Sequence, residues 1–273
     1  MGEGSALRKR IISSVLMTSL VFLIIFFFPT WVFALLASAL IGLSLHEFYA
    51  MAAKKGIFVY KHFGISAGML VPVIVYLQRG TVGYVDLDAA FIVLACLFAF
   101  VLQFTRRDNS QALMSIAVTM MGLLYIGWFL SFFVKLKFLP DGPVLVTYLI
   151  LVTKSSDIGA YFIGRRFGKK SLIPRISPSK TIEGTIGGFG TSVCVSMACA
   201  TFLPAYLRGH VVVLGAFFGV LSQVGDLAES LLKRDCGVKD SGRKFSGFGG
   251  VLDMLDSLFF TAPIFYYYVV MLR

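Results

Sequence analysis

Long apolar stretches separated by short polar loops fill the chain from residue 11 to residue 272. Most of them have the roughly 20 residues that an α-helix needs to cross the hydrocarbon core of a bilayer. We therefore predict an all-α, polytopic integral membrane protein with about nine transmembrane helices. The predicted spans are residues 11–28, 31–51, 63–77, 87–104, 112–134, 143–163, 182–207, 211–232 and 252–272.

Positive charge alternates between the loops that join these spans. With nine spans, one side of the membrane receives the N-terminus together with most of the lysines and arginines. Because cytoplasmic loops are enriched in these residues, the alternation predicts a cytoplasmic N-terminus. The cations on that side lie at residues 8–10, 54–61, 106–107, 165–180 and 233–244.

The composition supports a membrane protein and limits the choice of partners. Hydrophobic residues make up 58% of the chain and charged residues 14%. A soluble domain has about 45–50% apolar and about 25% charged residues. The net charge of +11 is spread over short loops beside the membrane. This placement favours anionic lipid and an anionic substrate over nucleic acid.

Polar and charged residues suited to catalysis or binding are concentrated in the second half of the chain. This distribution predicts a division of the chain into two regions. Residues 1–140 are expected to form a transmembrane scaffold of about five helices, and residues 141–273 a catalytic region of about four helices with cytoplasmic loops. His46 and Glu47 are the exception within the scaffold. Ionisable groups at that depth are paired or functional, and we favour structural pairing for these two.

The stretch from Gln223 to Asp256 concentrates acids, bases and glycines in a chain that otherwise has little charge. On a helix, Asp226, Glu229, Ser230 and Lys233 recur at positions i, i+3, i+4 and i+7. This spacing places two carboxylates, a hydroxyl and an ammonium group on one helical face.

A second apolar helix is predicted after a glycine-rich loop. Gly249 and Gly250 open it, and Asp253 and Asp256 lie three residues apart on one face of its first turns. The cations before this helix are suited to hold phosphate groups. They are Lys233, Arg234, Lys239, Arg243 and Lys244.

Six carboxylates fall near the predicted cytoplasmic ends of the last four spans. A charge at membrane depth costs about 2.5–3.5 kcal/mol, so their concentration in one leaflet predicts a shared cationic partner. Carboxylate oxygens bind hard cations, and Mg²⁺ completes its shell with water and substrate phosphate. For Asp157 the alternative to cation binding is an ion pair with Lys154 that only stabilises its helix. The six are Asp157, Glu183, Asp226, Glu229, Asp253 and Asp256.

An anion-binding segment is predicted between the sixth and seventh spans. Pro178 prevents a helix from running through Ser177, and Ser179 or Thr181 can cap the helix that follows. Free amide groups at that helix start, two hydroxyls and Lys180 together form a cradle for an anion.

These segments resemble the CDP-diacylglycerol synthase family, also called the phosphatidate cytidylyltransferases. The family signature reads S-x-x-K-R, four residues, K-D, and a glycine-rich turn ending in H-G-G-x-x-D-R-x-D. The segments D-I-G-A-Y from Asp157 and S-P-S-K-T-I-E-G from Ser177 are also similar to family segments. Phe248 stands in place of the signature histidine and Met254 in place of its arginine. The matching residues are Ser230, Lys233, Arg234, Lys239, Asp240, Gly249, Gly250, Asp253 and Asp256.

The resemblance implies the transfer of CMP from CTP to phosphatidic acid, which yields CDP-diacylglycerol and pyrophosphate. It also implies a homodimer in the bacterial inner membrane with a cytoplasmic active site, Mg²⁺ or in its place Mn²⁺ as cofactor, and a monovalent cation as a further candidate. The expected catalytic residues are Asp226, Lys233, Asp253 and Asp256. The expected metal ligands are Asp226, Asp253 and Asp256, with Asp157 and Glu229 as additional candidates. The expected CTP and phosphatidate ligands are Ser177, Ser179, Lys180, Thr181, Glu183, Ser230, Arg234, Lys239, Asp240, Gly249 and Gly250.

Two other functions compete with this interpretation. A CTP-dependent kinase of a lipid alcohol would use similar residues and release CDP. A cation or proton-coupled transporter would line a pathway with the same carboxylates. Such a pathway needs polar groups toward both membrane faces, whereas the outer halves of the last four predicted spans carry almost none.

Overall fold

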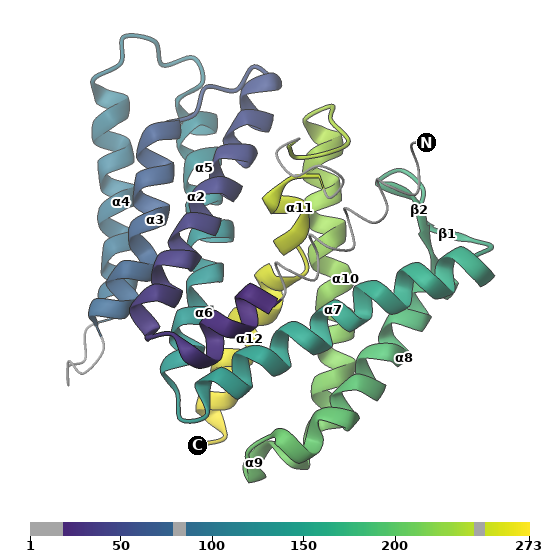
Figure 1. The fold of residues 1–273 in the computed structure, drawn as a ribbon. Coiled ribbons are helices and arrows are strands. Elements are labelled where there is room, and N and C mark those ends of the chain that lie inside the picture. The colour runs from purple at the N-terminus through teal and green to yellow at the C-terminus, as the bar shows by residue number, and fades with distance from the viewer. Residues whose placement is uncertain (1–18, 79–85, 243–248) are drawn as a thin grey trace, which may run out of the picture.

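The computed structural model describes residues 19–78, 86–242 and 249–273 (Figure 1). Residues 19–27 are helical and precede the labelled elements. The elements are α2 Thr30–Lys54, α3 Lys61–Leu77, α4 Leu87–Phe104, α5 Ala112–Gly122, the π-helical turn η1 Leu123–Trp128, α6 Phe129–Phe138, α7 Gly142–Phe167, β1 Ser171–Ile173, β2 Ser177–Thr181, α8 Ile182–Ala198, the 3₁₀ turn η2 Cys199–Phe202, α9 Ala205–Arg208, α10 Val211–Asp235, α11 Val251–Leu255 and α12 Leu258–Met271.

Helices make up most of the described chain, and the fold is that of an all-α polytopic membrane protein. In the described part of the chain, six helical stretches are long and apolar enough to cross a membrane. Helix α3 has only 17 residues, and α7 has 26 residues but carries charges such as Lys154 and Asp157. The first predicted span begins outside the described residues. The number of nine spans and the cytoplasmic N-terminus stay predictions.

Two local features differ from the sequence-based expectation. The segment around Pro178 is not a plain loop, because β1 and β2 pair as an antiparallel hairpin. The last predicted span is also broken between α11 and α12. At this break the amide of Ser257 donates to the Asp256 side chain at 2.6 Å, so a side chain satisfies a group that a continuous helix would bond to its own backbone.

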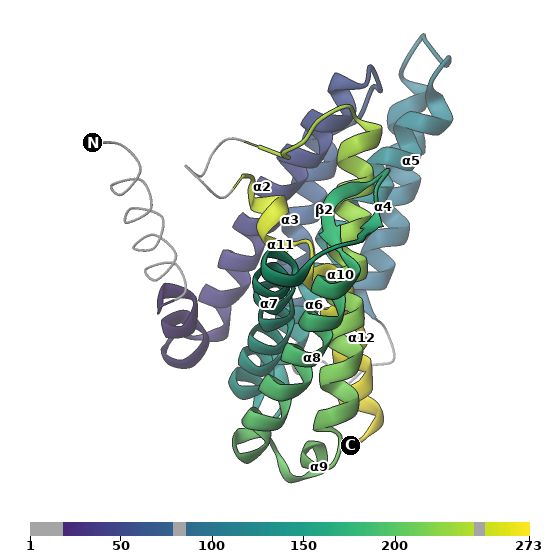
Figure 2. The same cartoon turned by 90° about the vertical axis from the view of Figure 1, so that its right-hand side faces the viewer.

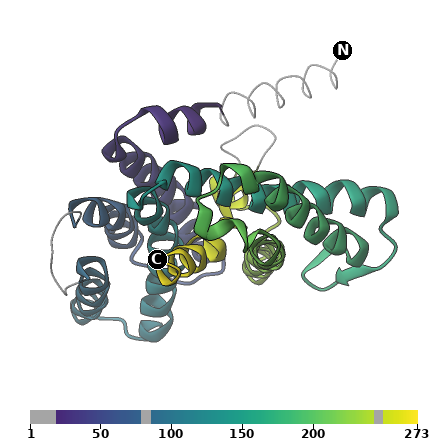
Figure 3. The same cartoon turned by 90° about the horizontal axis from the view of Figure 1, so that it is seen from below.

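The helices form two groups joined by the C-terminal helices. Helices α7, α8 and α10 pack together, while α2 to α5 lie on the other side (Figures 1 and 3). Helix α12 packs against α6, and α11 contacts α2. The expected division near residue 140 stays a prediction, and these contacts connect its two parts.

Loops that are distant in sequence meet at one end of the bundle, where the hairpin also lies (Figure 2). Lys55, after α2, forms an ion pair with Asp235 at 2.5 Å. Arg234 donates through Nε to the carbonyl of Ile176 in the hairpin at 3.1 Å. The loops that the charge pattern assigns to the cytoplasm therefore share one end of the molecule.

Close contact between α7 and α8 requires a glycine at position 188. A Cβ atom at Gly188 would lie 2.7 Å from the carbonyl oxygen of Ser156 and 3.0 Å from the Cβ of Ala160. A Cβ atom at Gly190, two residues further along α8, would meet nothing within 4 Å.

We expect Gly188→Val to destabilise the protein by about 1–3 kcal/mol, because overpacking at this contact separates α7 from α8. Gly190→Val carries the same helix-propensity change without the clash and is the matched control. Thermal unfolding in detergent measures both. Equal melting temperatures for the two variants would contradict this packing argument.

Candidate active site

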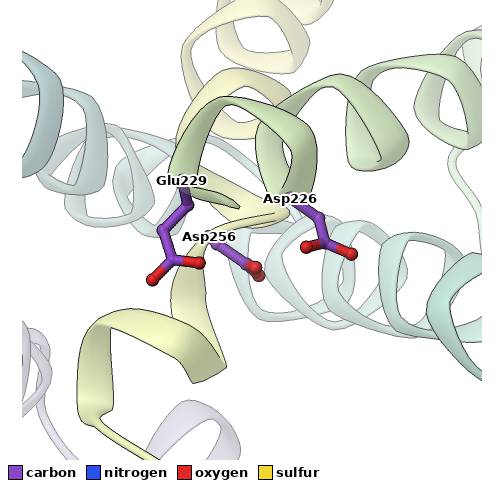
Figure 4. A group of neighbouring side chains, drawn as sticks. All are labelled: Asp226, Glu229 and Asp256. Atoms are coloured by element: carbon purple, nitrogen blue, oxygen red, sulfur yellow. The ribbon is translucent and has the colours of Figure 1, made fainter. Parts of the chain in front are cut away.

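Three carboxylates gather where α10 passes the break between α11 and α12 (Figure 4). One oxygen from each of Asp226, Glu229 and Asp256 lies within 4.8 Å of the others. Glu229 is fully buried and Asp256 is 7% exposed. Gly225 permits the approach, since a Cβ atom there would lie 2.5 Å from the carbonyl oxygen of Asp256. We call these three residues the carboxylate cluster.

Two lysines neutralise only part of the carboxylate cluster. Lys180 on β2 pairs with Asp226 at 2.6 Å. Lys233 pairs with Glu229 one helical turn away and also with Asp253 at 2.7 Å. The Oε1 atom of Glu229 is buried and, among the described residues, has no hydrogen-bond donor. A buried side-chain oxygen without a donor, beside two further carboxyl groups, fits a bound hard cation.

Asp253 lies beside the carboxylate cluster and is engaged elsewhere. Its Oδ2 atom accepts hydrogen bonds from the amide of Gly250 at 2.7 Å, from the amide of Ser241 at 3.2 Å and from the Ser241 hydroxyl at 2.9 Å. The bond to Gly250 caps the start of α11. Asp253, which the sequence predicts as a metal ligand, thus positions Lys233 in this structure.

Asp157 joins α7 to the same region through three side chains. It accepts hydrogen bonds from Ser222 at 2.7 Å and from Ser257 at 2.9 Å. Lys154 pairs with it at 3.1 Å, so the ion pair considered as an alternative is present. Asp157 also lines a cavity, so its surroundings include more than the ion pair with Lys154.

A polar cavity of about 340 Å³ opens beside the carboxylate cluster, between α7, the hairpin, α8 and α10. Lys180 and Arg165 supply positive charge, and Ser179 and Thr181 supply hydroxyls. Thr181 caps α8 as predicted, because its side chain accepts the amide of Gly184 at 3.1 Å. The cavity combines cations, hydroxyls and a helix start, which are suited to phosphate groups.

Several predicted ligands occupy other positions in the described structure. Glu183 accepts the amides of Lys169 and Lys170 and so holds the base of the hairpin. Ser230 contacts Asp226 only weakly, at 3.5 Å. Arg234 contacts backbone carbonyls, Ser177 is buried in the hairpin, and Lys239 and Asp240 are exposed. Arg243, Lys244 and Phe248 lie outside the described residues.

Several residues that line the polar cavity were missing from the predicted ligand set, and three of them have long polar side chains. Tyr161, Arg165 and Gln223 line the polar cavity. Asp157, Tyr161 and Arg165 are spaced four residues apart, which places them along one face of α7. This spacing offered a local signal for Tyr161 and Arg165, whereas the inward orientation of Gln223 follows from the packing of α10.

Comparison with known proteins identifies the family of the chain. The model of the cytidylyltransferase family matches residues 8–272. The chain belongs to the cytidylyltransferase family. Its relatives include proteins named phosphatidate cytidylyltransferase from Synechocystis sp., 34% identical over 97% of both chains, and from Bacillus subtilis, 30% identical over 96% of this chain and 97% of the relative. A third, from Brucella suis, is 33% identical over 96% of this chain and 93% of the relative. The family predicted from the sequence is confirmed.

Glu47 connects the N-terminal half of this cytidylyltransferase to the site. Its buried carboxylate accepts the amide of Leu252 at 3.0 Å and the hydroxyl of Ser241 at 3.2 Å. Ser241 in turn contacts Asp253. A Cβ atom at Gly250 would lie 2.2 Å from Glu47 Oε2, so a larger residue there would displace the Glu47 carboxylate. The structural pairing expected for Glu47 is therefore present, and it reaches the residues around Lys233.

We expect Glu47→Ala to lower both stability and activity, because it leaves the buried amide of Leu252 without its acceptor, at a cost of about 1–3 kcal/mol, and leaves Asp253 as the acceptor for the Ser241 hydroxyl. Glu47→Gln keeps an acceptor oxygen and is expected to retain most of both. Thermal unfolding and turnover are measured on the same preparations. If the glutamine variant fails as badly as the alanine variant, hydrogen bonding to α11 is not what Glu47 provides.

Proposed function

We propose that the protein is a phosphatidate cytidylyltransferase, which converts CTP and phosphatidic acid into CDP-diacylglycerol and pyrophosphate. The observation that carries the proposal is the position of the carboxylate cluster beside a cationic cavity, in a chain whose full-length relatives bear that name. The chemistry needs a place for a triphosphate next to the membrane. The carboxylate cluster lies on helical stretches that are long and apolar enough to span a membrane. The cationic cavity is lined partly by such helices.

The reaction is an in-line displacement at phosphorus. A phosphate oxygen of phosphatidic acid attacks the α-phosphorus of CTP, the bond to the bridging oxygen of the β-phosphate breaks, and pyrophosphate leaves. A side-chain nucleophile is not required, so the protein acts by positioning the two substrates and stabilising charge. Lys180 and Arg165 are placed to hold the triphosphate and the departing pyrophosphate in the polar cavity.

Asp226, Glu229 and Asp256 are the residues we propose to hold a divalent ion, with Mg²⁺ as the cofactor and Mn²⁺ as its substitute. When bound, the ion would supply charge neutralisation to the phosphate oxygens. The orphaned oxygen of Glu229 is the feature that supports this assignment. Lys233, held between Glu229 and Asp253, balances the buried charge on the other side of the cluster.

The membrane orientation and assembly belong to the same proposal. We place the hairpin end of the bundle at the cytoplasmic face of the inner membrane, where CTP is available. Support comes from the lysines and arginines gathered in the loops at that end. The expected homodimer rests on the family resemblance.

Asp226→Asn and Asp256→Asn should each lower the rate of cytidylyl transfer strongly. The loss of a charged metal ligand should cost several kcal/mol of transition-state stabilisation. Asp235→Asn removes a carboxylate from the exposed end of α10, the helix that carries Asp226. It should leave the rate close to that of the wild type. Turnover is measured with and without Mg²⁺. Undiminished wild-type turnover in excess chelator would rule out the metal.

Product analysis separates transfer from the competing kinase function. With CTP labelled at the α-phosphate, we expect label in the lipid product and an equal amount of free pyrophosphate. A lipid kinase would instead place a γ-phosphate label in the lipid and release CDP. Detection of CDP as the stoichiometric product would refute the proposed reaction.

A further inference from the structure

A second cavity lies next to the proposed site and has the opposite character. It has a volume of about 280 Å³ and is bounded by residues 20–22, α2, α6, α7 and the segment from α11 into α12. Its lining includes Phe33, Leu36, Ala37, Met254 and Leu258. Among the described residues that line it, Lys154 alone carries a charge. We call this space the apolar cavity.

The apolar and polar cavities meet at one ion pair. Lys154 lines the apolar cavity and Asp157 lines the polar cavity. Their charged groups lie 3.1 Å apart, and both contact the hydroxyl of Ser257. The side chain of Lys154 is 33% exposed. Lys154 and Asp157 therefore mark the boundary between an apolar lining and a polar one.

We propose that the apolar cavity binds an acyl chain of phosphatidic acid and that Lys154 receives the phosphate of the same lipid. This inference rests on the proposed function and assigns the lipid its place in the site. An apolar lining keeps the acyl chain of a membrane lipid out of water while the lipid occupies the site, and an anionic headgroup needs a cation at the end of that lining.

Two further observations favour a lipid chain over a protein segment. Leu20, which lines the cavity, is 56% exposed, so the cavity opens onto an apolar surface. Met254, which stands where the resemblance predicts arginine, also lines the cavity. Methionine is flexible and apolar, so at this position it adapts to a hydrocarbon chain without introducing a second charge.

Ala37→Trp fills the apolar cavity and tests the assignment. Ala39 lies on the same helix, is exposed and is not part of the lining, so Ala39→Trp is the matched control. The measured quantity is the ratio of kcat/KM for dioleoyl phosphatidate to that for dihexanoyl phosphatidate. We expect Ala37→Trp to lower this ratio about tenfold, through lost contacts to the longer chain. The control should keep the wild-type ratio.

An unchanged ratio in the Ala37→Trp variant, or an equal fall in the control, would overturn the assignment. If Ala37→Trp does not fold, photo-crosslinking of the wild-type protein with phosphatidate carrying a diazirine in its acyl chain gives the answer without turnover. Adducts on α2, α7 and α11 support the assignment, and adducts confined to the outer face of α4 refute it. Failure of the proposed function would appear separately, as no CDP-diacylglycerol from either lipid.

Discussion

Carboxylate groups buried among apolar helices set the condition that the rest of this structure has to meet. Each unpaired charge at membrane depth costs about 2.5–3.5 kcal/mol, and Glu229 and Asp256 are almost completely buried. Lys180 and Lys233 offset part of that cost from two different elements, the hairpin and α10. The hairpin, α10 and the α11–α12 break therefore have to be correctly placed together. Removing one partner would leave an uncompensated charge in a low-dielectric environment.

This requirement explains why the N-terminal half contributes to a site that the sequence motifs place in the C-terminal half. Glu47 on α2 accepts the amide of Leu252, and the contact spans 205 positions along the chain. Through Ser241 it also supports Asp253, which holds Lys233. The scaffold helices thus fix the start of α11, while the glycine at position 250 leaves room for the Glu47 carboxylate. A polar cavity and an apolar cavity on the two sides of Lys154 and Asp157 complete the arrangement.

Local patterns in the sequence predicted what depends on local physics. The apolar run between Asp86 and Thr105 predicted α4 with its observed bounds. Ser179 and Thr181 were the two candidates for the cap of α8, and Thr181 makes the capping bond. The helical period placed Asp226 and Glu229 together. It did not show that Asp253 turns toward Lys233 while Asp256 faces the cluster, because this depends on the break at Ser257. The contact made by Glu47 has no local signal in the sequence.

A divalent cation held by Asp226, Glu229 and Asp256 is the feature on which the proposed chemistry depends most. Anomalous diffraction from crystals of the wild-type protein grown with Mn²⁺ tests it directly, because the signal locates the ion without reference to activity. We expect one anomalous peak with oxygens of these three carboxylates at the short, roughly 2.1 Å distance typical of small divalent ions. A peak elsewhere in the protein, or an absence of density between the three side chains in well-ordered crystals, would contradict it.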